Sequence, residues 1–502
     1  MVLTERATEL TLELIEGTDR TIPVSTEKQS GDDPPERKKW LVRLPSGPDS
    51  SDRFLRFSYV LEKGSEPIFH VGPDGAFAGG ISTAWYPQLL GADGTRMLAI
   101  GEIRFEVPPG QSVYTAGKPT HSASQRAAGS FRFRLTEPVY IAFASGGYKI
   151  QGHGTLSLYL LRERTGALSY LRRLEHVIQV LAGEFGPFPY KSFALIEVPA
   201  DAGRAAGFDG ASLDGMMLAI GPFLDRPFNL AFYGHEIGHQ WWGGVVRRKG
   251  TDGAYLMDEA LAQWGSLRAV DAIAGPRAAE QHRRVGHPGY YFEYSGFSYL
   301  RRIEQGFDHE LSTLLVSDGT LSRRMANSKG MLVWDMLAAV IGRERFRVTL
   351  KDIVRRNWFR RLAWKDLWDA IESGAGQDLS WFYQQWFART GAPSWTLSWR
   401  QDGKTLRGSI EQGEPFYRLE AKVVINGEEC SSRQAQALRI EGRRTEFEWE
   451  VPFRASSVLV DPEFEVLHWT EEYRRDAAVL EPFTRGDLAL VYGRRTANMR
   501  PG

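Results

Sequence analysis

The first third of the chain alternates between hydrophobic and polar residues with a period of two. Residues 40–44 and 54–61 are two such runs, and clusters of Gly, Pro and Asp separate them from their neighbours. This period is typical of strands with one buried face, so we predict an all-β domain over residues 1–165. The polar stretch 25–39 carries Gly31 and two consecutive prolines, which predicts a surface loop.

The period changes at Leu168. Aliphatic residues recur at intervals of three and four over residues 168–181, which predicts an amphipathic helix that Gly183 and Gly186-Pro187 end. A strand is predicted at residues 193–199, followed by a glycine-rich loop over residues 201–215.

The rest of the chain is predicted to be helical first and β afterwards. Helical spacing dominates residues 259–385, and alternation returns in residues 395–399 and 419–425. The expected fold is therefore α+β and multidomain. Its parts are an N-terminal all-β domain (1–165), a mainly helical domain (166–393), a second β domain (394–475) and a tail (476–502).

Composition excludes several classes of protein. Lys+Arg and Asp+Glu are equal at 62 each, so no net charge attracts nucleic acid or an acidic membrane surface. The single cysteine, Cys430, cannot form an internal disulfide or a cysteine metal cluster. The chain as given has neither a secretory signal pattern nor about 18–20 continuous apolar residues. We expect a cytoplasmic protein with no membrane segment and no nucleic-acid partner.

Residues 233–244 contain the strongest chemical motif in the sequence. His235 and His239 are four residues apart, with Glu236 between them. On a helix both imidazoles project from one face, as a zinc hydrolase needs, and Glu236 can take a proton from the attacking water. Glu259, in a second predicted helix, is the candidate third ligand for one Zn²⁺ ion. The alternative is a hydrogen-bonded pair of core histidines.

These motifs together resemble peptidase family M1, the gluzincin group of alanyl aminopeptidases and leukotriene hydrolases. Residues 235–243 resemble the family's H-E-x-x-H-Q-W-F-G, and residues 258–262 resemble its N-E-G-F-A. Weaker matches occur in the expected order at residues 85–87, 107–110, 366–382 and 460–463. The resemblance implies an N-terminal β-sandwich or saddle domain, a thermolysin-like catalytic domain, a small C-terminal β-sandwich and a peptide substrate.

The spacing to the third ligand departs from the family pattern. The family places eighteen residues between the second His and the Glu, but here residues 240–258 make nineteen. A strict spacing would make Asp258 the ligand. We prefer Glu259, because Asp258 then takes the place of the family's Asn, and a one-residue insertion in the loop 247–253 costs little.

The family's G-x-M-E-N motif is also altered. Alignment puts Ser212 at the position of the glutamate that binds the substrate's α-amine. A serine cannot supply the negative charge that this ammonium needs. Asp209 and Asp214 are the candidate substitutes for it, so we predict altered recognition of the substrate N-terminus.

The third departure concerns the family's Y-x-K-G tyrosine, which hydrogen-bonds the oxyanion. Asn327 stands in its place and still offers an N–H donor. Arg323, Arg324 or a tyrosine from residues 290–294 are alternative donors. Two hypotheses follow: a zinc metallopeptidase, which intact Glu236 favours, or a weak or inactive zinc-binding relative that acts as a scaffold, which the two replacements favour.

Overall fold

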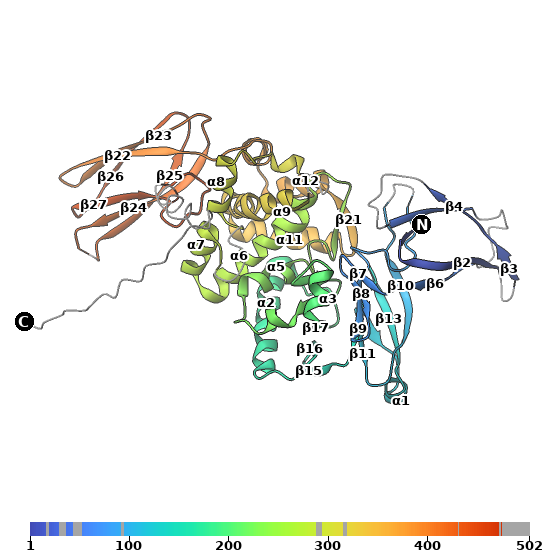
Figure 1. The fold of residues 1–502 in the computed structure, drawn as a ribbon. Coiled ribbons are helices and arrows are strands. Elements are labelled where there is room, and N and C mark those ends of the chain that lie inside the picture. Colours follow the sequence, from blue (N-terminus) through green and yellow to red (C-terminus); the bar gives the residue numbers. More distant parts are fainter. Residues whose placement is uncertain are drawn as a thin grey trace, which may run out of the picture. The chain divides into compact units, whose positions relative to one another are not determined.

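The computed structural model is a mixed α/β molecule with several sheets and a central helical region (Figure 1). It describes residues 1–16, 20–29, 37–43, 53–91, 95–287, 294–314, 319–429, 431–470 and 473. The chain divides into two compact units. The first comprises Met1–Ala279, Leu315–Gly319 and Ile341–Asp378; the second comprises Glu280–Leu314, Thr320–Val340 and Leu379–Gly502.

The N-terminal strands, blue to cyan in Figure 1, form four antiparallel sheets. Two sheets have the orders β1 (Val2–Thr4)-β5 (Arg37–Arg43)-β4 (Ser25–Gln29) and β3 (Arg20–Pro23)-β2 (Ala7–Glu16)-β6 (Arg53–Leu61). A third has the order β10 (Ala99–Glu106)-β13 (Ser130–Val139)-β12 (Lys118–Pro119). The fourth has the order β11 (Ser112–Thr115)-β14 (Ala142–Gly146)-β9 (Gly75–Gly79)-β8 (Phe69–Gly72)-β7 (Gly64–Glu66).

The β structure predicted for this part is confirmed, with only the short helix α1 (Ala123–Ala127) added among the described residues. The loop predicted at residues 25–39 is wrong at both ends, because β4 and β5 pair with each other there. Their backbone hydrogen bonds form despite the polar composition. Residues 30–36 of that prediction lie outside the described part.

The sheet that leads to the metal-binding motif has the order β15 (Lys149–His153)-β16 (Leu156–Leu160)-β17 (Phe193–Val198)-β19 (Met216–Ile220)-β18 (Gly210–Leu213). Strands β16, β17 and β19 are parallel, and α2 (Ala167–Phe185) connects β16 to β17. The predicted helix and strand are thus confirmed. The loop predicted at 201–215 is wrong, because it contains most of α3 (Ala200–Ala205) and all of β18.

Helices α5 (Leu230–Gly238) and α6 (Leu261–Ala274) pack against each other and against α2. Two glycines of α5 permit the close approach. A Cβ on Gly234 would lie 2.9 Å from Ser266 Cα, and a Cβ on Gly238 would lie 3.0 Å from Ala262 Cα. Only glycine fits such contacts without a shift of the backbone. The remaining elements of the first unit include α11 (Arg343–Arg356), α12 (Trp364–Ala375) and the parallel pair β20 (Val246–Lys249) and β21 (Arg360–Ala363).

The second unit holds α8 (Gly296–Glu304), most of α10 (Met331–Ile341), α13 (Ser380–Trp386) and two three-stranded antiparallel sheets. The sheets are β22 (Trp395–Asp402)-β23 (Thr405–Gln412)-β26 (Arg444–Glu450) and β25 (Arg433–Ile440)-β24 (Leu419–Gly427)-β27 (Ala455–Val460). The return of β structure after residue 393 is confirmed. The tail at 476–502 lies outside the described residues. Within the described ranges, no helix has the length and hydropathy to cross a membrane.

Candidate metal centre

Helix α5 presents the two histidines to one side. Its N-terminus is capped by Asn229, whose side-chain oxygen accepts from the amide of Phe232 over 3.0 Å. His235 lies in the last turn, and His239 follows directly after the helix, with its amide bonded to the His235 carbonyl over 3.2 Å. The spacing of four therefore brings both imidazoles together, as the sequence predicts.

Glu259 lies in a π-helical turn, η1 (Leu256–Ala260), immediately before α6. π-helical turns are rare in proteins, and those that occur frequently lie at functional sites. The close packing of α5 on α6, through Gly234 and Gly238, brings this carboxylate to the histidines. The helix predicted around Glu259 is confirmed.

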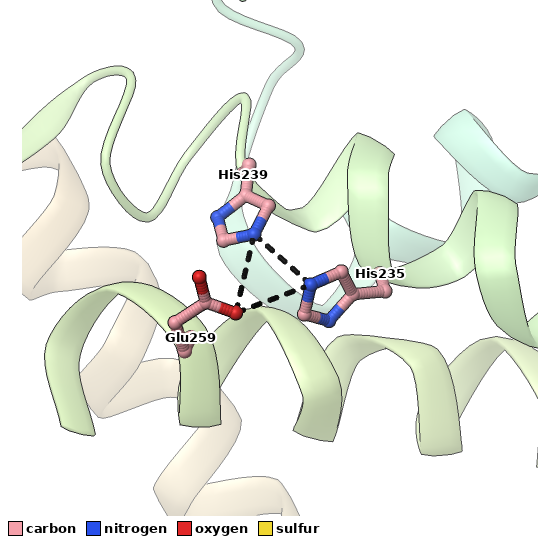
Figure 2. Close-up of side chains that lie close together, drawn as sticks. All are labelled: His235, His239 and Glu259. Carbon is pink, nitrogen blue, oxygen red and sulfur yellow. Dashed lines mark hydrogen bonds and ion pairs between the residues drawn. The ribbon is translucent and has the colours of Figure 1, made fainter. Parts of the chain in front are cut away.

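The three side chains point at one another (Figure 2). His235 Nε2 lies 3.1 Å from His239 Nε2, and Glu259 Oε2 lies 3.4 Å and 3.9 Å from these two atoms. A tetrahedral zinc ion with ligands at about 2.05 Å would place them about 3.3 Å apart. The spacings and the donor set of two imidazoles and a carboxylate therefore fit zinc. Among the described residues these three form the one such group.

The electrostatics of the site favour positive charge. His235 is buried, which opposes its charged form, yet its pKa is raised because Glu259 and Glu236 lie close to it. The side chains of His239 and Glu259 are 20% and 17% exposed, so solvent reaches the centre.

Asp258, the alternative ligand, is directed elsewhere. Its Oδ2 lies 3.6 Å from Nε of Arg248. Burial raises the pKa of Asp258 to about 6, while Arg248 opposes that shift. The geometry thus groups Glu259, and not Asp258, with the histidines.

Ser212 lies on β18 beside α5. Its hydroxyl donates to the backbone carbonyl of Glu236 over 2.7 Å and accepts from Nε2 of Gln240 over 2.7 Å. Gln240 is not among the site residues predicted from the sequence. The one feature that could have indicated it is that a polar residue directly follows the second histidine. In the structure Gln240 is buried.

The two candidate acids near Ser212 have different surroundings. Asp209 is exposed. Asp214 is buried in an ion pair with Arg247 at 2.7 Å, and it also accepts from the hydroxyl of Tyr190 over 2.9 Å. The carboxylate of Asp214 already has charged and neutral donors, whereas that of Asp209 faces solvent.

Asn327 lies on another π-helical turn, η4 (Ala326–Gly330), in the second unit, where it is fully buried. Arg323 is exposed and Arg324 is partly buried, both on α9 (Gly319–Met325). Of the tyrosine segment only Tyr294 is described. The catalytic role considered for these residues stays a prediction.

Comparison with known proteins shows relatives of this site. Residues 229–386 match the peptidase family M1 domain. The chain is 24% identical over 213 residues to probable aminopeptidase 1 of Saccharolobus solfataricus. The aligned region covers 41% of this chain and 26% of that protein. It is 26% identical over 163 residues to aminopeptidase N of Lactococcus lactis. This aligned region covers 32% of this chain and 18% of that protein. These matches thus span about a quarter or less of each relative's length.

The fold is similar to a crystal structure of Legionella pneumophila aminopeptidase A in complex with aspartic acid. The TM-score is 0.62 at 13% identity, and the match covers 98% of this chain and 60% of that chain. The matching relatives are aminopeptidases, and the His235-His239-Glu259 group is consistent with a metal site. Residues 229–386 form a peptidase family M1 domain, and the chain is a distant homologue of M1 aminopeptidases.

Proposed function

We propose that this protein is a zinc-dependent metallopeptidase that hydrolyses peptide bonds in the manner of aminopeptidases, with a thermolysin-like catalytic domain and a C-terminal β-sandwich. The convergence of His235, His239 and Glu259 carries the proposal, because their spacings fit a tetrahedral ion. A bound zinc ion supplies Lewis acidity for water and for a carbonyl oxygen.

Glu236 is the general base of the proposed reaction. It follows His235 directly on α5 and is only partly buried, so its carboxylate would be accessible to water if His235, His239 and Glu259 held a zinc ion. It takes the proton of the attacking water and returns it to the leaving amine. A scaffold protein has no chemical need for a carboxylate here.

Recognition of the substrate N-terminus differs in this proposal from that of the family's exopeptidases. Ser212 offers no negative charge, Asp209 is exposed and Asp214 is paired with Arg247. An α-ammonium that entered a pocket without a carboxylate would be desolvated and unpaired, which costs on the order of several kcal/mol. Blocked or internal peptide bonds therefore become substrates.

The second candidate is a zinc-binding relative with little or no turnover, acting as a scaffold or binding module. Asn327 at the position of the family's tyrosine supports it. Loss of one oxyanion donor typically lowers the rate by about 10²–10³.

One experiment separates the two candidates. Peptides of identical sequence, with free or acetylated N-termini, are incubated with protein of measured zinc content. The proposal expects cleavage of both forms, with no strong preference for the free amine. Full zinc occupancy without cleavage of any peptide would favour the scaffold.

A further inference from the structure

Two polar side chains brace β18 against the end of α5. The Ser212 hydroxyl donates to the Glu236 carbonyl, and Gln240 Nε2 donates to the Ser212 oxygen, each over 2.7 Å. Gln240 Nε2 also donates to the Leu213 carbonyl, and its Oε1 accepts from the Gly215 amide, both over 3.0 Å. We call Ser212 and Gln240 the β18–α5 brace.

The brace acts where α5 changes its hydrogen-bond pattern. In a continuing α-helix the amide of Gln240 would bond the carbonyl of Glu236, four residues earlier. Here that amide bonds the carbonyl of Ile237 instead, over 2.9 Å. The Ser212 hydroxyl binds the Glu236 carbonyl at this point, and so satisfies a group that helix ends leave to other partners.

We propose that Ser212 is a positioning residue for Glu236, and that Gln240 holds Ser212 in the orientation this requires. The inference deepens the proposed function, since it rests on Glu236 being the general base. The base oxygen must lie within about 2.6–3.2 Å of the atom that carries the proton, so a small shift of its backbone is costly.

The hydrogen-bonding capacity of the hydroxyl supports this role. A serine hydroxyl has one donor hydrogen and two acceptor lone pairs. The Glu236 carbonyl takes the hydrogen and Gln240 fills one lone pair, which leaves one neutral acceptor site. The Ser212 hydroxyl is therefore already bonded to the Glu236 carbonyl and to the Gln240 side chain before any substrate arrives.

The chain offers a matched control at the other end of the same helix. The Ser266 hydroxyl donates to the backbone carbonyl of Ala231, also over 2.7 Å. Ser212→Ala and Ser266→Ala thus delete the same kind of bond to α5, but only the first lies at Glu236. A general loss of stability would affect both variants alike.

The first measurement is the kinetics of peptide hydrolysis. Ser212→Ala should lower kcat about tenfold or more with little change in KM, because one aligning hydrogen bond is lost. Ser212→Thr keeps the hydroxyl and should restore most of the rate. Gln240→Met should behave like Ser212→Ala, and Ser266→Ala should keep the wild-type kcat. Wild-type kcat in Ser212→Ala would overturn the inference, as would an equal loss in Ser266→Ala.

The second measurement, amide hydrogen exchange, needs no activity. Ser212→Ala should raise the exchange rate in the segment 236–242, whereas Ser266→Ala should leave that segment unchanged. If the wild type cleaved no peptide, the proposed function would fail and exchange alone would decide this inference. Unchanged exchange in Ser212→Ala would then overturn it.

Discussion

Asp214 Oδ2 lies 2.7 Å from Arg247 Nη2, and both side chains are buried. The same carboxylate accepts from the hydroxyl of Tyr190 and from the amide of Tyr140, over 2.9 Å and 2.8 Å. The ion pair therefore connects the turn between β18 and β19 with β20. The bond from the Tyr140 amide connects the same turn with the N-terminal part of the chain. This turn begins two residues after Ser212.

Asp214→Asn should destabilise the fold. Removal of one partner leaves the Arg247 charge buried and uncompensated, which typically costs about 3–5 kcal/mol. Chemical denaturation measures the change, and Asp209→Asn, at an exposed position, should stay within about 0.5 kcal/mol of the wild type. Wild-type stability in Asp214→Asn, combined with a changed preference for free N-termini, would instead make Asp214 the substrate's anchor.

The sequence predicts the features of this protein that depend on local spacing. His235 and His239 are one helical turn apart, so their common direction needs no knowledge of the tertiary fold. The choice of Glu259 over Asp258 depended on keeping a helix in phase, and the structure groups Glu259 with the histidines. The loop predicted at 247–253 is wrong at its start, because residues 247–249 belong to β20. Glu259 itself lies in a π-helical turn, which no pattern in the sequence indicates.

Features that depend on distant partners were missed. β18 has only four residues, too few for its alternation to stand out in the sequence, and it pairs with β19. The bond from Ser212 to Glu236 joins residues 24 positions apart. Nothing in their spacing signals it, since a strand and a helix meet there only through the fold.

The identity of the metal ligands can be tested by substitution. His235→Ala and Glu259→Ala should each lower the zinc content of purified protein well below one ion per chain, while the fold is retained, because an open catalytic site contributes less to folding than a closed structural one. Asp258→Ala should keep its zinc. Retention of zinc in Glu259→Ala together with its loss in Asp258→Ala would reverse the assignment.

Ser212→Glu tests how the N-terminus of the substrate is recognised. A carboxylate at this position can pair with an α-ammonium through a charge-assisted hydrogen bond. We expect the ratio of hydrolysis of free to acetylated peptides to rise, while the overall rate falls because the hydroxyl bond to Glu236 is lost. A wild type that already requires a free amine would show that another acid binds it.

The burial of His468 leads us to predict that its contribution to folding stability depends on pH. Burial lowers the pKa of its imidazole to about 4. The unfolded chain takes up this proton near pH 6.5 and the folded chain does not, so the contribution of His468 to folding stability falls as the pH drops from 6.5 towards 4, by about 3 kcal/mol. Burial also raises the pKa of Asp461, 3.5 Å away, to about 7, so below pH 6 little negative charge faces the ring.

The His468→Gln variant isolates this contribution. As the pH falls from 6.5 towards 4, the unfolding free energy of the wild type should decrease relative to that of the variant. Urea titrations at a series of pH values measure it. Parallel curves for the two proteins would mean that His468 titrates normally in the folded state.

The most direct test of the central claim combines zinc binding and peptide hydrolysis in one preparation. Protein stripped of metal by a chelator is titrated with zinc, for the wild type and for Glu236→Gln. We predict that wild-type activity returns in proportion to zinc and saturates at one ion per chain, while Glu236→Gln binds the same ion but recovers at most about a hundredth of the activity. Equal recovery in Glu236→Gln, or zinc binding by the wild type without any hydrolysis, would contradict the account.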